Sequence, residues 1–189
     1  MNYLAVAIAG YLCLGLEEAL RPPLMLGQTG IAPYFVLVLV AYIATNASTY
    51  PVLWTSLLLG LAVDLTAMRP IDGGTAVINI IGPNALGYVA GAYLVLTLRG
   101  VMIRRNPATL AFLTVCCSLL AQLVVVTLYL FRSLFDSAIT FNAFDDLAAR
   151  AACCLYTVAS AFVLGYLLER CRPWFGFSDQ SARRVTGRR

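Results

Sequence analysis

Few residues of this chain are suited to acid–base or metal chemistry, because it contains no His and no Lys. Proton transfer would therefore depend on carboxylates, and Asp64 is the most prominent of them, near the end of the apolar run that starts at Pro51. A carboxylate beside a membrane-length apolar run is costly unless it lies near the interface or has a partner. We expect Asp64 to cap the next turn or to pair with Arg69. The alternative is a contact to a ligand or a coupling ion.

No group of residues in the sequence resembles a catalytic centre. The acidic residues form no recognisable pair with a nucleophile, so we predict that the chain is not an enzyme. The turn Asp72-Gly73-Gly74 lacks the Lys and the spacing of a phosphate-binding loop, which favours a structural turn. Adjacent cysteines such as Cys116 and Cys117 point about 100° apart on a helix and do not hold one metal ion. We therefore expect no metal and no cofactor, and interpret the six cysteines as packing residues.

The apolar segment Thr75–Leu98 contains both a proline and a pair of closely spaced glycines. Pro83 removes one backbone donor, so we expect it to kink the helix. Gly87 and Gly91 lie four residues apart on one helix face. Small residues at this spacing let two membrane helices approach closely, which predicts a packing contact along this face.

Asp64, Asn79, Asn84 and Gln122 are polar side chains within the apolar segments that could contact one another. Such residues most often form hydrogen bonds between helices, each worth about 1 kcal/mol. Together they could instead line a small cavity. We favour the hydrogen-bonding interpretation and keep the cavity as the alternative.

The composition is typical of an integral membrane protein. Hydrophobic residues make up 61% of the chain and charged residues 12%, with a mean hydropathy of +0.84. A helix of about 20 apolar residues crosses the hydrocarbon core, and six segments reach this length alone or with their flanks. They are Tyr3–Leu16, Ile31–Ala47, Val52–Ala67, Thr75–Leu98, Pro107–Phe131 and Leu147–Leu168. The predicted fold is an all-α six-transmembrane-helix bundle, whose first segment is a retained helix and not a signal peptide.

The arginines predict the orientation of the bundle. With six crossings and a cytoplasmic N-terminus, nine of the 13 arginines fall in the inner loops and tail, and four fall outside. Both termini are therefore expected in the cytoplasm, after one transmembrane domain over residues 1–168 and a basic tail over 169–189. Arg150, one of the outer four, lies about one turn into the sixth segment, and we expect its side chain to extend outward.

Aromatic residues are followed by arginines in the C-terminal tail. Trp174, Phe175 and Phe177 precede two Arg pairs, which suits the inner headgroup region. Each Arg there adds about 1 kcal/mol of attraction to anionic lipid. So few charges beside a membrane segment do not suggest nucleic-acid binding.

Over roughly Leu20 to Pro107, the chain resembles the MreD family of rod shape-determining membrane proteins. Pro33 precedes a Val- and Leu-rich segment, as at the entry of the family's second span. The run Gly60-Leu61-Ala62-Val63-Asp64-Leu65 is similar to the family's G-[LF]-x-x-D-[LIV] signature. Gly73 or Gly74 matches the glycine that follows, and Arg99 closes a similar aromatic-to-arginine exit.

The resemblance implies a non-enzymatic inner-membrane component of the bacterial elongation machinery. Its implied partners are the membrane protein MreC, the MreB filament, and RodA with its transpeptidase. The family is also similar in fold to the substrate-binding S component of energy-coupling-factor vitamin transporters, which supplies the alternative function. A scaffold predicts that the four polar residues bond to one another and leave no sizeable cavity. A transporter subunit predicts an outward-facing pocket that several of them line.

Overall fold

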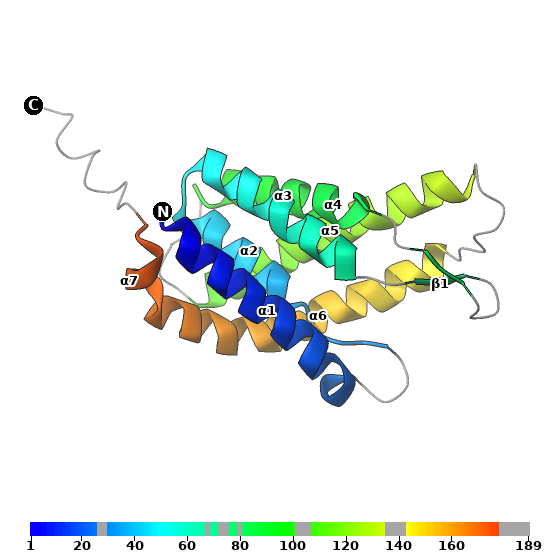
Figure 1. Cartoon of the computed structure of the whole chain (residues 1–189), viewed down its shortest axis with the longest axis horizontal. Helices are drawn as coiled ribbons and strands as arrows, with labels where there is room; N and C mark the ends of the chain where they lie inside the picture. Colours follow the sequence, from blue (N-terminus) through cyan, green and yellow to red (C-terminus); the bar gives the residue numbers. More distant parts are fainter. Residues whose placement is uncertain are drawn as a thin grey trace, which may run out of the picture.

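We describe the fold from a computed structural model that covers residues 1–25, 30–66, 69–71, 76–78, 81–100, 107–134 and 143–177 in enough detail to interpret. In these ranges the chain consists of helices, one short β-hairpin and short connecting segments (Figure 1). The elements are α1 (Tyr3–Leu24), α2 (Phe35–Asn46), α3 (Thr49–Thr66), β1 (Arg69–Ile71), β2 (Ala76–Ile78), α4 (Pro83–Leu98), α5 (Pro107–Ser133), α6 (Ala143–Arg170) and α7 (Arg172–Phe175).

Four of the described helices are long and apolar enough to cross a membrane, which confirms a bundle of membrane-length helices. These are the stretches Tyr3–Leu24, Thr49–Thr66, Ala108–Ser133 and Asp146–Arg170. Two further apolar helices, α2 and α4, are shorter, with 12 and 16 residues. At 1.5 Å per residue they extend about 18 Å and about 24 Å, less than the hydrocarbon thickness.

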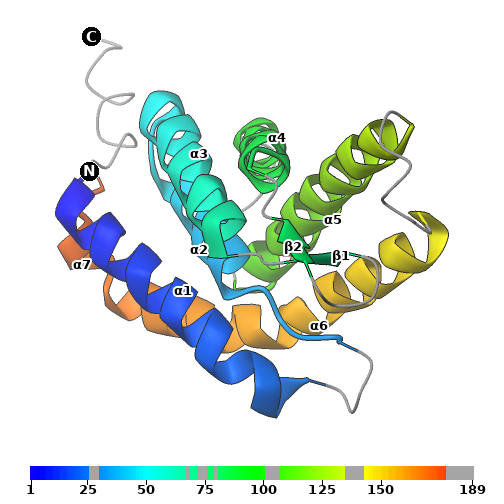
Figure 2. The same ribbon diagram turned by 45° about the vertical axis from the view of Figure 1, so that its right-hand side comes forward.

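The centre of the bundle is α2. Ten of its 12 residues are buried, and it contacts α1, α3, α4, α5 and α6, which lie around it (Figure 2). Its sequence is apolar on every side, without the polar stripe of a surface helix. This pattern is what a helix enclosed by other helices requires.

The region before α4 differs from the predicted continuous helix. The expected segment began at Thr75, but Ala76–Ile78 pairs antiparallel with Arg69–Ile71, and the helix begins only at Pro83. Gly82 has φ 125°, a conformation that favours glycine, and turns the chain into the helix. At the first helical position Pro83 needs no backbone donor, so the predicted kink is wrong. Gly73, Gly74 and Asn79 lie outside the described residues.

The first two predicted segments also have different limits. The first was expected to end at Leu16, but α1 continues through Glu17 and Glu18 to Leu24. The second was expected from Ile31, but residues 31–34 are not helical and α2 begins at Phe35. Both differences lie at the end of the bundle where α1 finishes and α2 begins. Glu17 and Glu18 are part of a helix there, and residues 31–34 form a non-helical segment that leads into α2.

Three glycines bring α3, α4 and α5 into backbone contact. A Cβ on Gly87 would lie 2.6 Å from the Ala121 carbonyl oxygen, and one on Gly91 would lie 2.6 Å from that of Cys117. On the opposite side of α4, a Cβ on Gly60 would lie 2.6 Å from the backbone of Ala85. The small-residue spacing therefore serves helix packing, as it predicts.

The N-terminus and the beginning of the tail meet at one end of the bundle. The Asn2 amide donates to the Phe175 carbonyl at 2.8 Å. Phe175 and Phe177 each place their ring 5.9 Å from that of Tyr42 in α2. Of the three tail aromatics that we expected at the lipid headgroups, two thus pack inside the protein, and only Trp174 is largely exposed.

We call the opposite end of the molecule the pocket end. There α1, α3 and α5 finish and α2, α4 and α6 begin, and the hairpin lies at this end as well (Figure 1). At this end α5 and α6 extend beyond the first turns of α2 and α4 (Figure 1). The pocket described below lies beside these first turns.

Candidate functional site

Asp64 is the cap of a helix that begins 19 residues later. Its carboxylate is 1% exposed and accepts hydrogen bonds from the backbone amides of Gly82, Asn84 and Ala85, at 2.9, 3.1 and 3.1 Å. The Asn84 side-chain amide adds a fourth bond at 2.9 Å. The first amides of a helix lack partners within it and carry partial positive charge, so a buried carboxylate is stabilised there. Capping is one of the two structural roles expected for Asp64 from the sequence, the other being a pair with Arg69.

Glu17 performs the same task for α2. Its Oε2 accepts the Val36 amide at 3.0 Å, and the Thr157 hydroxyl accepts the Tyr34 amide at 2.9 Å. No role is predicted for Glu17 from the sequence. The available signal was its place, because Glu17 and Asp64 both follow long apolar runs and both precede a short apolar helix by 18 residues or so.

Arg99 stabilises the other end of α2. Its Nη1 donates to the Ala44 carbonyl at 2.8 Å and to the Ala47 carbonyl. The last carbonyls of a helix lack partners within it and carry partial negative charge, which suits a guanidinium. The central helix is therefore held by a carboxylate from α1 at its start and by an arginine from the end of α4 at its finish.

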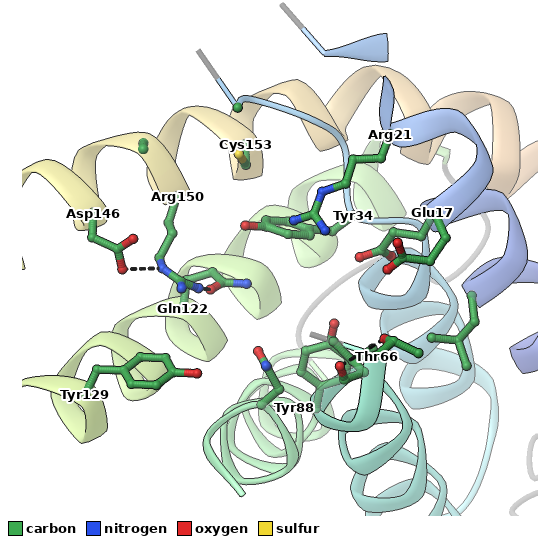
Figure 3. A pocket seen from close by; sticks show the side chains of 16 residues that line it. Glu17, Arg21, Tyr34, Thr66, Tyr88, Gln122, Tyr129, Asp146, Arg150 and Cys153 are labelled. Carbon is green, nitrogen blue, oxygen red and sulfur yellow. Dashed lines mark hydrogen bonds and ion pairs between the residues drawn. The ribbon is translucent and has the colours of Figure 1, made fainter. Parts of the chain in front are cut away.

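A pocket of about 260 Å³ lies at the pocket end. Its polar lining is contributed by five helices and the residue before α2. These residues include Glu17 and Arg21 of α1, Tyr34, Thr66 of α3, Asn84 and Tyr88 of α4, Gln122 and Tyr129 of α5, and Asp146, Arg150 and Cys153 of α6 (Figure 3). Segments far apart in the sequence thus converge on one polar cavity.

A network around Arg150 forms the wall of α5 and α6. The Nε of Arg150 lies 2.6 Å from the Asp146 carboxylate, and Nη1 donates to the Gln122 side-chain oxygen. Its guanidinium carbon also lies 6.0 Å from the centre of the Tyr129 ring, within cation–π range. The Arg150 side chain is only 12% exposed, because it is held by Asp146 of its own helix and by Gln122 of the neighbouring helix.

Glu17 lies across the pocket from Arg150, with Tyr34 and Tyr88 between them (Figure 3). Tyr88 is 1% exposed, and Asn84 beside it is buried as well. The cavity is thus bounded on two sides by charged side chains of both signs and by aromatic rings between them. An arrangement of this kind can hold a small polar molecule, but it contains no nucleophile with an adjacent base.

The structure brings together only part of the predicted polar group. Asp64 bonds directly to Asn84, whereas Gln122 bonds to Arg150, and Asn84 and Gln122 both line the pocket. Asp64 itself is engaged by α4 and does not line it. Pro33 is buried just before the start of α2, while Arg99 acts at the opposite end of that helix.

The six cysteines are all free thiols within or next to helices. Cys13, Cys117, Cys153 and Cys154 are buried, as packing residues are. Within the described ranges, no three side chains of His, Cys, Asp or Glu gather in a way that could hold a metal ion.

Comparison of this chain with protein-family models, curated proteins and solved structures gives no match. The resemblance to the MreD family therefore stays a prediction that rests on the residues quoted above.

Proposed function

We propose that this protein is a non-enzymatic scaffold of the bacterial inner membrane that organises sidewall peptidoglycan synthesis, as the resemblance to the MreD family implies. Its partners are then an MreC-like membrane protein, the MreB filament, and RodA with its transpeptidase. The observation that carries the proposal is that the buried charged side chains bond to the ends of helices of this same chain. Glu17, Asp64 and Arg99 are each engaged at a helix end, which suits a rigid platform for partners.

The proposed topology has six crossings and cytoplasmic termini. The bond between Asn2 and Phe175 supports it, because both ends of the described chain then lie at one end of the bundle, as an even number of crossings requires. In this topology α2 and α4 complete their crossings with the non-helical segments that precede them. The pocket end faces the outside of the cell, and the basic tail meets anionic lipid on the inside.

Depletion of the protein in its host, followed by imaging of cell outline and of wall insertion, tests the scaffold function. Depleted cells are expected to lose rod shape and dispersed sidewall insertion. A pull-down in mild detergent is expected to recover an MreC-like protein. Cells that keep both their shape and their insertion pattern after depletion would contradict the proposal.

The pocket favours a second candidate, a substrate-binding subunit similar to the S component of energy-coupling-factor transporters. Its supporting observation is that Asn84 and Gln122 line a cavity, as this alternative predicts. Mass spectrometry of the purified protein separates the candidates. A vitamin-sized solute bound in stoichiometric amount, without an MreC-like partner, supports the transporter, and co-purification of an MreC-like partner supports the scaffold.

A further inference from the structure

The scaffold function makes no use of the pocket between α1 and α6. At about 260 Å³ it is slightly smaller than the range of about 300–1,000 Å³ typical of drug-sized ligands. Polar groups surround it on several sides, so it does not resemble the dry apolar voids left by imperfect packing. Its size and lining suit a small polar molecule.

The charges around the pocket favour a positively charged ligand. Three carboxylates in the lining, those of Glu17, Glu18 and Asp146, face two guanidiniums, those of Arg21 and Arg150. Asp64 adds a fourth carboxylate next to the lining residue Asn84. Three helices begin and three end at the pocket end, so the partial charges of their termini roughly cancel. The carboxylates therefore leave an excess of about two negative charges.

The two sides of the pocket differ in what they offer a ligand. On the α6 side, Asp146 and Gln122 already bond to Arg150, so that side is close to neutral. On the α1 side, two carboxylates, those of Glu17 and Glu18, face the single guanidinium of Arg21, so this side keeps about one negative charge. Glu17 accepts the backbone amides of Val36 and Phe35, and a carboxylate has room for further donors. A cationic group is therefore stabilised best beside Glu17.

Aromatic rings complete the recognition of a cation. Tyr34 and Tyr88 lie between Glu17 and Arg150, and Tyr129 lies beneath the Arg150 guanidinium (Figure 3). Ring faces attract cations and stack on flat apolar groups. A carboxylate beside aromatic rings is the combination that proteins use to bind organic ammonium groups.

We propose that this pocket binds a small organic cation with an aromatic or similarly flat part, its charged nitrogen at Glu17 and its flat part between Tyr34 and Tyr88. This inference goes beyond the scaffold function and does not depend on it, because a scaffold stands whether or not the pocket is occupied. Binding is reversible and involves no covalent step.

A series of ligands that are similar in size but differ in charge tests the proposal on the full chain in detergent micelles. The probes are phenethylamine, 2-phenylethanol and phenylacetate, which share one ring and differ in charge. Isothermal titration gives their affinities, and thermal melting reports their effect on stability. Phenethylamine is expected to bind at least tenfold more tightly than either other probe. Equal or tighter binding of phenylacetate, or no binding of phenethylamine at millimolar concentration, would overturn the proposal.

A matched pair of variants locates the cation. Glu17→Gln removes the charge but keeps an oxygen that can accept the Val36 amide, so α2 stays capped. It is expected to weaken phenethylamine binding at least tenfold and to leave 2-phenylethanol binding unchanged. Glu169→Gln removes one charge at the far end of the molecule and should change neither affinity. Unchanged phenethylamine affinity in a folded Glu17→Gln variant would reject the assigned position.

Choline extends the series without an aromatic ring. It is expected to bind more weakly than phenethylamine, because it cannot stack its flat part between the tyrosines. Tighter binding of choline would reject the requirement for a flat part. These outcomes are independent of the depletion experiment, so the ligand and the scaffold function can fail separately.

Discussion

Asp64 illustrates how a buried charge can be tolerated among apolar helices. Its two oxygens accept four hydrogen bonds from the start of α4, and the helix dipole adds a favourable field. The sequence shows a carboxylate near the end of an apolar run and a polar turn after it, so the capping role could be predicted. The sequence does not predict which amides Asp64 caps, because that depends on where the next helix begins.

Replacing Asp64 with Ala is expected to lower the free energy of unfolding by at least about 2 kcal/mol, since three backbone amides and the Asn84 amide lose their acceptor. Melting in detergent micelles measures the loss. Glu18→Ala is the control, because Glu18 is exposed, and it should change stability by no more than about 0.5 kcal/mol. Equal effects of the two substitutions would contradict the capping role.

Arg99 allows a second test at a helix end. Arg99→Ala is expected to destabilise the protein by about 1–3 kcal/mol, because the Ala44 and Ala47 carbonyls lose a charged donor. The stability of Arg99→Lys should lie between those of Arg99→Ala and the unchanged protein, since an ammonium keeps the charge but lacks the planar shape of the guanidinium. Thermal melting of the three proteins gives the order. A Lys variant no better than Ala would show that charge near the helix end contributes little.

At the scale of elements, the first four helices form two similar units. In each, a long helix carries a carboxylate near its end and a short helix begins on that carboxylate: Glu17 for α2 and Asp64 for α4. The two short helices then pack against each other and against their neighbours. The pocket lies beside the first turns of both short helices.

The close approach of α4 and α5 predicts a strong effect of a single methyl group. Gly91→Ala should lower the free energy of unfolding by about 1–3 kcal/mol. The new Cβ would lie 2.6 Å from the Cys117 carbonyl oxygen, so the two helices must move apart. Gly15→Ala in α1 is the matched control, with no atom within 4 Å of its Cβ, and should be neutral or stabilising by up to about 1 kcal/mol. Thermal melting compares the two. Similar melting temperatures would argue against backbone contact at Gly91.

The start of α4 could not be predicted from the local sequence pattern. Residues 76–98 are almost uniformly apolar, so hydropathy alone extends the helix across Pro83. The change from strand to helix depends on Gly82 turning the chain and on Asp64, 18 residues earlier, accepting its amide. A window of neighbouring residues does not contain that carboxylate.

At the scale of the whole molecule, the position of the termini gives a prediction about topology. Since the N-terminus bonds to Phe175, reporters fused to either end should lie on the same side of the membrane. For the proposed orientation, green fluorescent protein at each end is fluorescent and alkaline phosphatase at each end is inactive. A reporter inserted in the segment between α5 and α6 should give the opposite pattern. Active phosphatase at the C-terminus would reject the topology.

Composition and hydropathy alone were enough to predict an apolar helical bundle, because a chain this poor in charge buries its backbone groups most readily in helices. Residue type and spacing also identified Asp64 as a cap and Gly87 and Gly91 as packing positions. The roles of Glu17, Arg99 and Arg150, and the pocket between them, were decided by the tertiary structure. Each of these roles depends on a partner from a different helix. Which helix ends meet is determined only by how α1, α3, α4, α5 and α6 pack around α2.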